Sequence, residues 1–334
     1  MKHVLTYASV LKKGSHDEVG SFVFAGVLSS RHEKPDPEPD SEPEEPDHEP
    51  DLETNEPEPY SEISDWPEDP DFGRVHPPDS FVDAAKVDLR GFFVKESESV
   101  FYQRQLQVIF EQKYFHWITV RALEELVQEG AIAREVLPLP DTGIITFYRA
   151  IRYRYWKRDA DEVVKLVCRF SESSFTYALG AHGETMFDAV LPTIGFMPKG
   201  RKVRSFRGVD WTESNHDLDR VFERDGVPYG VEIKNTLSYI ERRELEIKVR
   251  MCQRLALKPL FILRFAPKSY VQFVKENGGF TLIFKYQLYP FGQKAFADEV
   301  RARLRLPTDS PARIEDGTVK RLLDWHLRQV KRGG

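Results

Sequence analysis

The chain has 334 residues, of which 40% are hydrophobic and 31% charged, with a formal net charge of −6. This length allows about two domains. No apolar run approaches the ~18 residues that a membrane span needs, and two isolated cysteines exclude a disulfide framework or a cysteine-rich metal site. We therefore expect a cytoplasmic protein with no membrane partner.

The net charge hides two regions of opposite sign. Between Arg31 and Phe72 there are 18 acidic and 2 basic residues, so this tract carries −16 and the rest of the chain +10. A basic body favours a polyanionic partner such as nucleic acid. Because the tract repeats proline–acid pairs and has little apolar surface to bury, residues 31–72 are predicted to be a disordered, extended linker. An alternative is that the tract mimics nucleic acid and covers the basic surface. The pattern leaves the N-terminal segment, residues 1–30, unassigned.

Residues 81–150 show the order of a winged helix: two helices followed by a β-hairpin. The predicted elements are helices at 100–109 and 119–130 and strands at 132–136 and 144–148. Gly130 marks the end of the second helix. Such modules bind DNA with one helix in the major groove, and others serve as interaction or spacer domains. We expect Arg121, on the second helix, to be an exposed cation that contacts DNA.

Residues 151–171 are predicted to form a connecting helix that begins with a basic and aromatic stretch. Arg152, Arg154 and Lys157 alternate here with two tyrosines and a tryptophan. Basic groups bind phosphates and aromatic rings stack on bases, so these three cations are candidates for nucleic-acid binding. The alternative is an ordinary connecting segment whose aromatic residues pack inward.

Two short strands joined by a charged turn carry the candidate chemistry. They are predicted at 215–222 and 229–235. Because side chains alternate along a strand, Glu232 and Lys234 share one face, as do Asp217 and Asp219. If the strands pair, carboxylates and one ammonium meet in a single patch. Oxygen ligands of this kind suit Mg²⁺ or Mn²⁺ and indicate metal-dependent phosphodiester hydrolysis.

These motifs resemble the signature of the PD-(D/E)XK nuclease superfamily, to which restriction endonucleases and archaeal Holliday-junction resolvases belong. The family carries an Asp, a short turn and Glu-x-Lys on the next strand. Asp219, Glu232 and Lys234 match these positions, and Glu184, which opens a helical segment, matches the acid of the family's first helix.

The resemblance covers roughly residues 172–305. It implies an α/β fold with a restriction-endonuclease-like core of helix, mixed β-sheet and helix, preceded by the N-terminal winged-helix domain. Residues 306–334 would then be a C-terminal helical extension with a basic end.

The resemblance also implies roles for the matching residues. Asp219, Glu232 and Glu184 would bind Mg²⁺ (or Mn²⁺), and Lys234 would orient the attacking water or stabilise charge. Asp217 and Gln253 are auxiliary candidates.

The function implied is a magnesium-dependent endonuclease that acts on DNA in repair, recombination or defence. Two alternatives stay open: an RNA nuclease, and a catalytically inactive nuclease-fold protein that binds DNA or regulates. Many members of the superfamily act as homodimers, so a homodimer is also open.

Overall fold

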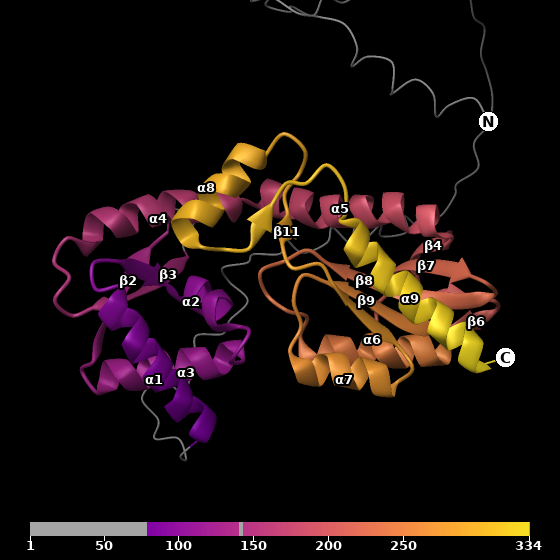
Figure 1. Cartoon of the computed structure of the whole chain (residues 1–334), viewed down its shortest axis with the longest axis horizontal. Helices are drawn as coiled ribbons and strands as arrows, with labels where there is room; N and C mark the ends of the chain where they lie inside the picture. Colours follow the sequence, from indigo (N-terminus) through magenta and orange to yellow (C-terminus); the bar gives the residue numbers. More distant parts are fainter. Residues whose placement is uncertain (1–78, 140–142, 334) are drawn as a thin grey trace, which may run out of the picture. The chain divides into compact units, whose positions relative to one another are not determined.

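The computed structural model describes residues 79–139 and 143–333 (Figure 1). The predictions for the N-terminal segment at 1–30 and for the acidic tract at 31–72 lie outside the described residues. In the part of the chain that is described, no helix is long and apolar enough to cross a membrane.

The described chain begins with three helices and a three-stranded antiparallel sheet. The elements are α1 (Ser80–Lys95), β1 (Val100–Tyr102), α2 (Gln103–Phe110), α3 (His116–Gln128), β2 (Ile132–Pro138) and β3 (Ile144–Ala150). The strand order is β1-β3-β2, and the predicted hairpin is confirmed. The predicted helix at 100–109 is wrong at its start, because its first three residues pair with β3 as a strand.

Helix α3 ends where the sequence predicts. Gly130 has φ +67°, and the N–H of Ala131 donates to the carbonyl of Leu126 at 2.9 Å, so a left-handed residue closes the helix. The helix begins at His116 rather than at Thr119. Tertiary structure supports this earlier start, because the His116 N–H donates to the hydroxyl of Tyr239, far along the chain, at 3.0 Å.

The remaining chain forms an α/β arrangement with a mixed five-stranded sheet flanked by helices. Two helices and a 3₁₀ turn precede the sheet: α4 (Trp156–Phe170), α5 (Ser173–Val190) and η1 (Leu191–Ile194). The sheet strands are β4 (Met197–Val203), β7 (Leu218–Arg224), β8 (Val227–Lys234), β9 (Lys258–Leu263) and β10 (Phe280–Ile283). Their order is β10-β9-β8-β7-β4, with β4, β7 and β8 antiparallel and β8, β9 and β10 parallel.

Helices cover both faces of this sheet. The other elements are β5 (Ser205–Phe206), β6 (Val209–Asp210), α6 (Arg242–Arg254), α7 (Lys268–Glu276), β11 (Gln287–Leu288), α8 (Lys294–Leu304), β12 (Thr308–Asp309) and α9 (Asp316–Gly333). Phe222, Val231 and Ile233 pack with α5 and α9 on one face. Val221 packs with α6 on the other face. The alternation of side chains along β7 and β8 therefore decides which residues can meet α6.

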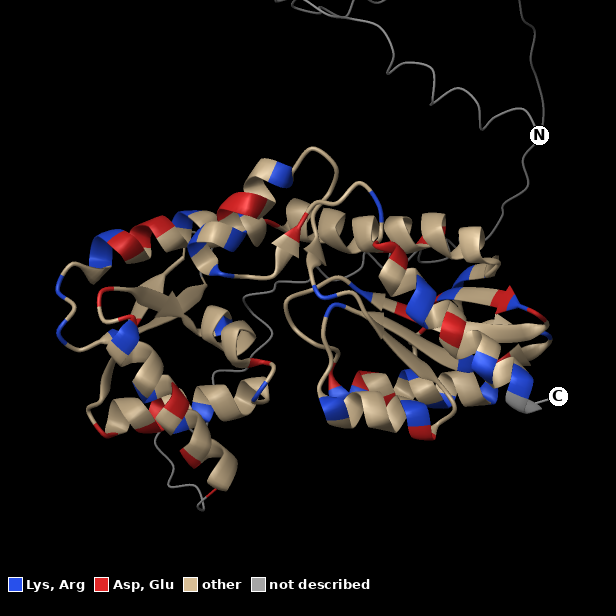
Figure 2. Ribbon diagram, in the orientation of Figure 1, with Lys and Arg blue, Asp and Glu red and all other residues tan. Residues whose placement is uncertain are grey.

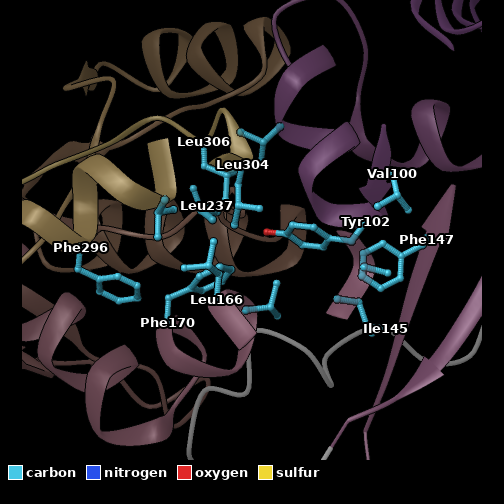
Figure 3. Close-up of a cluster of buried hydrophobic side chains, with 14 of the residues drawn as sticks. Val100, Tyr102, Ile145, Phe147, Leu166, Phe170, Leu237, Phe296, Leu304 and Leu306 are labelled. Carbon is cyan, nitrogen blue, oxygen red and sulfur yellow. The ribbon is translucent and has the colours of Figure 1, made fainter. Parts of the chain in front are cut away.

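A hydrophobic cluster joins the first elements to the later ones (Figure 3). Tyr102 and Phe147 from the three-stranded sheet pack with Leu166 of α4, Leu237 after β8 and Leu304 of α8. Buried polar contacts reinforce this junction. Arg264, which follows β9, makes a bidentate ion pair with Glu111 at 2.6 and 2.7 Å and donates to the carbonyls of Thr236 and Leu237.

Candidate active site

Asp219 of β7 and Glu232 of β8 lie on the same face of the five-stranded sheet. Arg220 pairs with Val231 in this antiparallel register, so the preceding residue, Asp219, stands opposite Glu232. The N–H of Ile233 donates to Asp219 Oδ2 at 2.8 Å and fixes the orientation of that carboxylate. Both acids are buried, with 7% and 1% of their surface exposed. The structure therefore brings together two carboxylates that the sequence places on separate strands.

The two carboxylates perturb each other. Burial, together with the negative charge of Glu232, raises the pKa of Asp219 to about 7. Burial also pushes the pKa of Glu232 upward, but the ammonium groups of Lys234 and Lys248 outweigh this effect and hold that pKa below its usual range. A cation beside Asp219 would favour its ionised form.

Two lysines neutralise Glu232. Lys234 Nζ lies 3.0 Å from Glu232 Oε1 and 3.0 Å from Glu244 Oε1. Lys248 Nζ lies 2.8 Å from Glu232 Oε2 and also donates to the carbonyl of Asp217. The charge of Glu232 outweighs the opposing effect of burial and raises the pKa of Lys248. Helix α6 thus supplies one acidic side chain, Glu244, and one basic side chain, Lys248, to the site.

The close packing of α6 depends on Gly230, two residues before Glu232. A Cβ at this position would lie 2.6 Å from Cys252 Sγ, so only glycine lets the helix approach the strand this closely. Glu244, Lys248 and Cys252 are spaced by four residues and therefore lie along one stripe of α6. This spacing, with Cys252 as the apolar member, is the signal that could have singled out Lys248 from the sequence.

Glu184 contacts the face of the sheet opposite to the one that carries the acid pair, Asp219 and Glu232. It sits within α5 rather than at a helix start, and its Oε2 accepts from Arg220 Nη2 at 2.6 Å. Arg220 also holds Asp188 of the same helix. Because Arg220 follows Asp219 directly on β7, the two side chains point to opposite faces. The structure does not join Glu184 to Asp219 and Glu232, so its role as a metal ligand stays a prediction.

The two auxiliary candidates differ in their positions. Asp217 directly precedes β7 and meets the site through its backbone carbonyl, which accepts from Lys248. Gln253 is exposed and donates to Asn277 Oδ1 at 2.7 Å, next to the end of α7. The structure therefore associates the backbone of Asp217 with the acid pair and gives Gln253 a contact elsewhere.

Three of the four candidate nucleic-acid contacts are exposed. Arg152, Arg154 and Lys157 lie on the surface around the start of α4, while Trp156 between them is buried. The expectation that Arg121 is exposed is wrong. Only 16% of its side chain is accessible, because it forms an ion pair with Glu125 one turn along α3, with Nε 3.1 Å from Oε1.

The acid pair fits a hard divalent cation. Asp219 and Glu232 offer carboxylate oxygens on one face. Burial and the charge of Glu232 raise the pKa of Asp219, and a cation between the two acids would oppose both effects. Within residues 79–139 and 143–333, no three His, Cys, Asp or Glu side chains gather around one point in a metal-binding arrangement. The protein would supply two carboxylates, and Mg²⁺ commonly keeps several water ligands in such sites.

Comparison with known proteins adds no relative: no protein-family model, curated protein or solved structure matches this chain.

Proposed function

We propose that this protein is a metal-dependent nuclease of the PD-(D/E)XK type that hydrolyses phosphodiester bonds in DNA. The observation that carries this proposal is the placement of Asp219 opposite Glu232, with the Lys234 ammonium 3.0 Å from the latter. These are three of the four residues at which the sequence resembles the family; the fourth, Glu184, contacts Arg220 instead. The convergence of the three on one face requires the strand pairing that the structure contains.

The order of the surrounding elements supports a restriction-endonuclease-like core. Helix α5 precedes three antiparallel strands, β4, β7 and β8, and helix α6 then leads to β9, which is parallel to β8. This is the helix, three-strand, helix, strand order of the family. The first elements support a winged-helix module, because α1, β1, α2, α3, β2 and β3 follow one another and their sheet order is β1-β3-β2.

Each residue of the site has a distinct task in this proposal. Asp219 and Glu232 would hold Mg²⁺ or Mn²⁺, which supplies Lewis acidity for attack by water on the phosphorus. The Ile233 N–H keeps the Asp219 carboxylate in place. Lys234 is held between Glu232 and Glu244, so its ammonium is suited to orient the water or to stabilise negative charge on the phosphoryl oxygens.

Lys248 favours a second candidate function, a nuclease-fold protein that binds DNA without cutting it. The Lys248 ammonium donates to Glu232 Oε2, and the Lys234 ammonium lies beside Glu232 Oε1. A carboxylate already neutralised by two buried or half-buried cations is a weaker ligand for a metal ion. In this alternative the site is a structural ion-pair network that keeps the nuclease architecture.

Incubation of the full chain with nucleic acids separates these functions. Duplex, branched and single-stranded DNA and RNA are tested with Mg²⁺, with Mn²⁺ and with a chelator, and Asp219→Asn serves as the matched control. This variant keeps an acceptor for the Ile233 N–H while removing one charge. Metal-dependent cleavage of DNA by the wild type alone is expected. DNA binding without cleavage under every condition would favour the second candidate function, a DNA-binding protein that does not cut. Cleavage of RNA alone would show that the substrate is RNA rather than DNA.

A further inference from the structure

The edge strand β4 of the five-stranded sheet and the hairpin that follows it, a separate two-stranded sheet of β5 and β6, carry a run of basic residues. We define the basic edge by its cations, Lys199, Arg201, Lys202, Arg204 and Arg207, all of which are exposed. Figure 2 colours Lys and Arg blue and Asp and Glu red on the ribbon, and both colours occur at this end of the sheet. β4 pairs with β7, which carries Asp219, so the basic edge directly adjoins the acid pair.

Lys202 is the member of the basic edge that reaches the candidate site. Arg201 pairs with Arg220 and Val203 with Leu218, so Lys202 stands opposite Asp219. Its Nζ lies 3.9 Å from Asp219 Oδ1. Its φ is +49°, in the left-handed region that a residue with a side chain rarely adopts within a strand. Strained backbone of this kind clusters at functional sites.

The three lysines around the acid pair differ in how firmly they are held. Lys248 is buried and Lys234 is one-fifth exposed, and both lie within 3.0 Å of Glu232. Lys202 has 65% of its side chain exposed and a longer contact with its acid. An exposed ion pair at this distance is weak, so the Lys202 ammonium can leave Asp219 and bind another anion at little cost.

The other cations of the basic edge leave positive charge facing solvent. Lys199 and Arg207 share a single acid, Glu223, at 3.3 and 2.7 Å. Arg204 donates to the neutral carbonyl of Ser214 at 3.2 Å, and no acid lies within ion-pair distance of it among the described residues. Arg201 is paired with Asp188 at 2.7 Å. The five cations therefore share three acids, Glu223, Asp188 and Asp219, and the basic edge keeps an excess of positive charge beside the acid pair.

We propose that the basic edge binds the phosphate backbone of duplex DNA. Lys202 would contact the phosphate beside Asp219, and Arg204 and Arg207 would contact neighbouring phosphates. Lys202 lies on β4, Arg204 in the bend between β4 and β5, and Arg207 in the turn between β5 and β6, so the three cations come from consecutive parts of one exposed segment. This inference rests on the proposed nuclease function, for which the basic edge would place one strand of the duplex over the acid pair.

Equilibrium binding of labelled duplex DNA to the full chain, measured in chelator across a range of salt concentrations, tests this proposal. Lys202→Asn removes the ammonium and leaves a residue that tolerates left-handed backbone. The slope of log Kobs against log salt should become shallower by about 0.9 for each lost phosphate contact. The triple variant with Arg204→Gln and Arg207→Gln should lose roughly three times as much.

Lys285→Asn is the matched control. Lys285 is also an exposed lysine with positive φ, at +74°, but it follows β10 at the opposite edge of the sheet. This variant should bind DNA with the affinity and salt slope of the wild type. Thermal melting of each variant should give a cooperative transition like that of the wild type, which checks that the fold is retained.

The outcomes separate this proposal from the nuclease assignment. Wild-type cleavage combined with unchanged binding by Lys202→Asn and by the triple variant would overturn the basic edge and leave the nuclease standing. Weakened binding by these variants, in a wild type that cuts nothing, would support the basic edge and reject the nuclease. A wild type that binds RNA but not duplex DNA, or neither, would overturn the basic edge as proposed.

Discussion

Lys248 Nζ lies 2.8 Å from Glu232 Oε2, and both side chains are buried between α6 and the sheet. A buried lysine needs a partner because an isolated ammonium is expensive to remove from water. A divalent cation and Lys248 would both be attracted to the same carboxylate. The site therefore combines a built-in counterion with the acids that would hold a metal.

Lys248→Met tests this competition. The substitution leaves Glu232 buried with one ammonium fewer, and removal of one partner of a buried pair typically costs about 3–5 kcal/mol. Mg²⁺ should recover part of this loss by binding the freed carboxylate, so the rise in Tm on adding Mg²⁺ should be larger in the variant than in the wild type. Arg250→Met, at an exposed cation of the same helix, is the control. An equal response to Mg²⁺ in all three proteins would argue against a metal at Glu232.

His116 should make the protein sensitive to acid. Its side chain is 1% exposed, and burial lowers its pKa from 6.5 to about 4. The unfolded chain therefore takes up a proton at higher pH than the folded protein, and stability is lost as pH falls from about 6.5 towards 4. The loss from this residue should be roughly 1.4 kcal/mol per pH unit within that window.

Urea unfolding at several pH values checks this prediction by comparing the wild type with His116→Phe. The buried ion pair with Arg264, together with His116, outweighs burial and lowers the pKa of Glu111, so protonation of Glu111 also weakens the fold in acid. The Arg264 ion pair is present in both proteins. The difference between the two curves is therefore the informative quantity. It should change between pH 6.5 and 4, and parallel curves would show that His116 does not titrate as described.

Gly230→Ala should destabilise the fold. The new methyl group would lie 2.6 Å from Cys252 Sγ and 2.8 Å from Leu218 Cδ1, and overpacking of this kind typically costs 1–3 kcal/mol. Adding Cys252→Ala should restore part of the stability, because it removes the closer of the two contacts. Gly180→Ala is the control, since a Cβ there meets nothing within 4 Å. Additive losses in the double variant, measured by chemical unfolding, would contradict the proposed contact.

The parts of the site that follow from local periodicity could be predicted from the sequence. Alternation along β8 places Glu232 and Lys234 on one face, and the turn between the strands indicates that Asp219 is near them. The four-residue spacing of Glu244, Lys248 and Cys252 places Lys248 on the same stripe of α6 as an apolar residue. Its burial against Glu232 does not follow from that spacing, because it depends on how closely α6 approaches Gly230. The partner of Glu184 also depends on tertiary structure, since it is set by which face of the sheet α5 covers.

The same distinction holds for the fold. The hairpin of β2 and β3 and the left-handed end of α3 at Gly130 follow from short-range signals and were predictable. The first residues of the expected helix at 100–109 instead form β1, because pairing with β3 outweighs the helical pattern there. Nothing within this short run indicates that pairing, which joins residues more than 40 positions apart.

Cleavage by Lys234→Ala, compared with the wild type and Asp219→Asn under single-turnover conditions with Mg²⁺, tests the central claim most directly. The claim is that Asp219 and Glu232 hold the metal and that Lys234 acts on the reacting phosphate. Lys234→Ala keeps both carboxylates, so DNA and divalent ions should still bind while the cleavage rate falls by roughly 10²–10⁴. Asp219→Asn should lose metal affinity as well as cleavage. Equal cleavage by the wild type and Lys234→Ala, or no cleavage of any nucleic acid by the wild type, would contradict the claim.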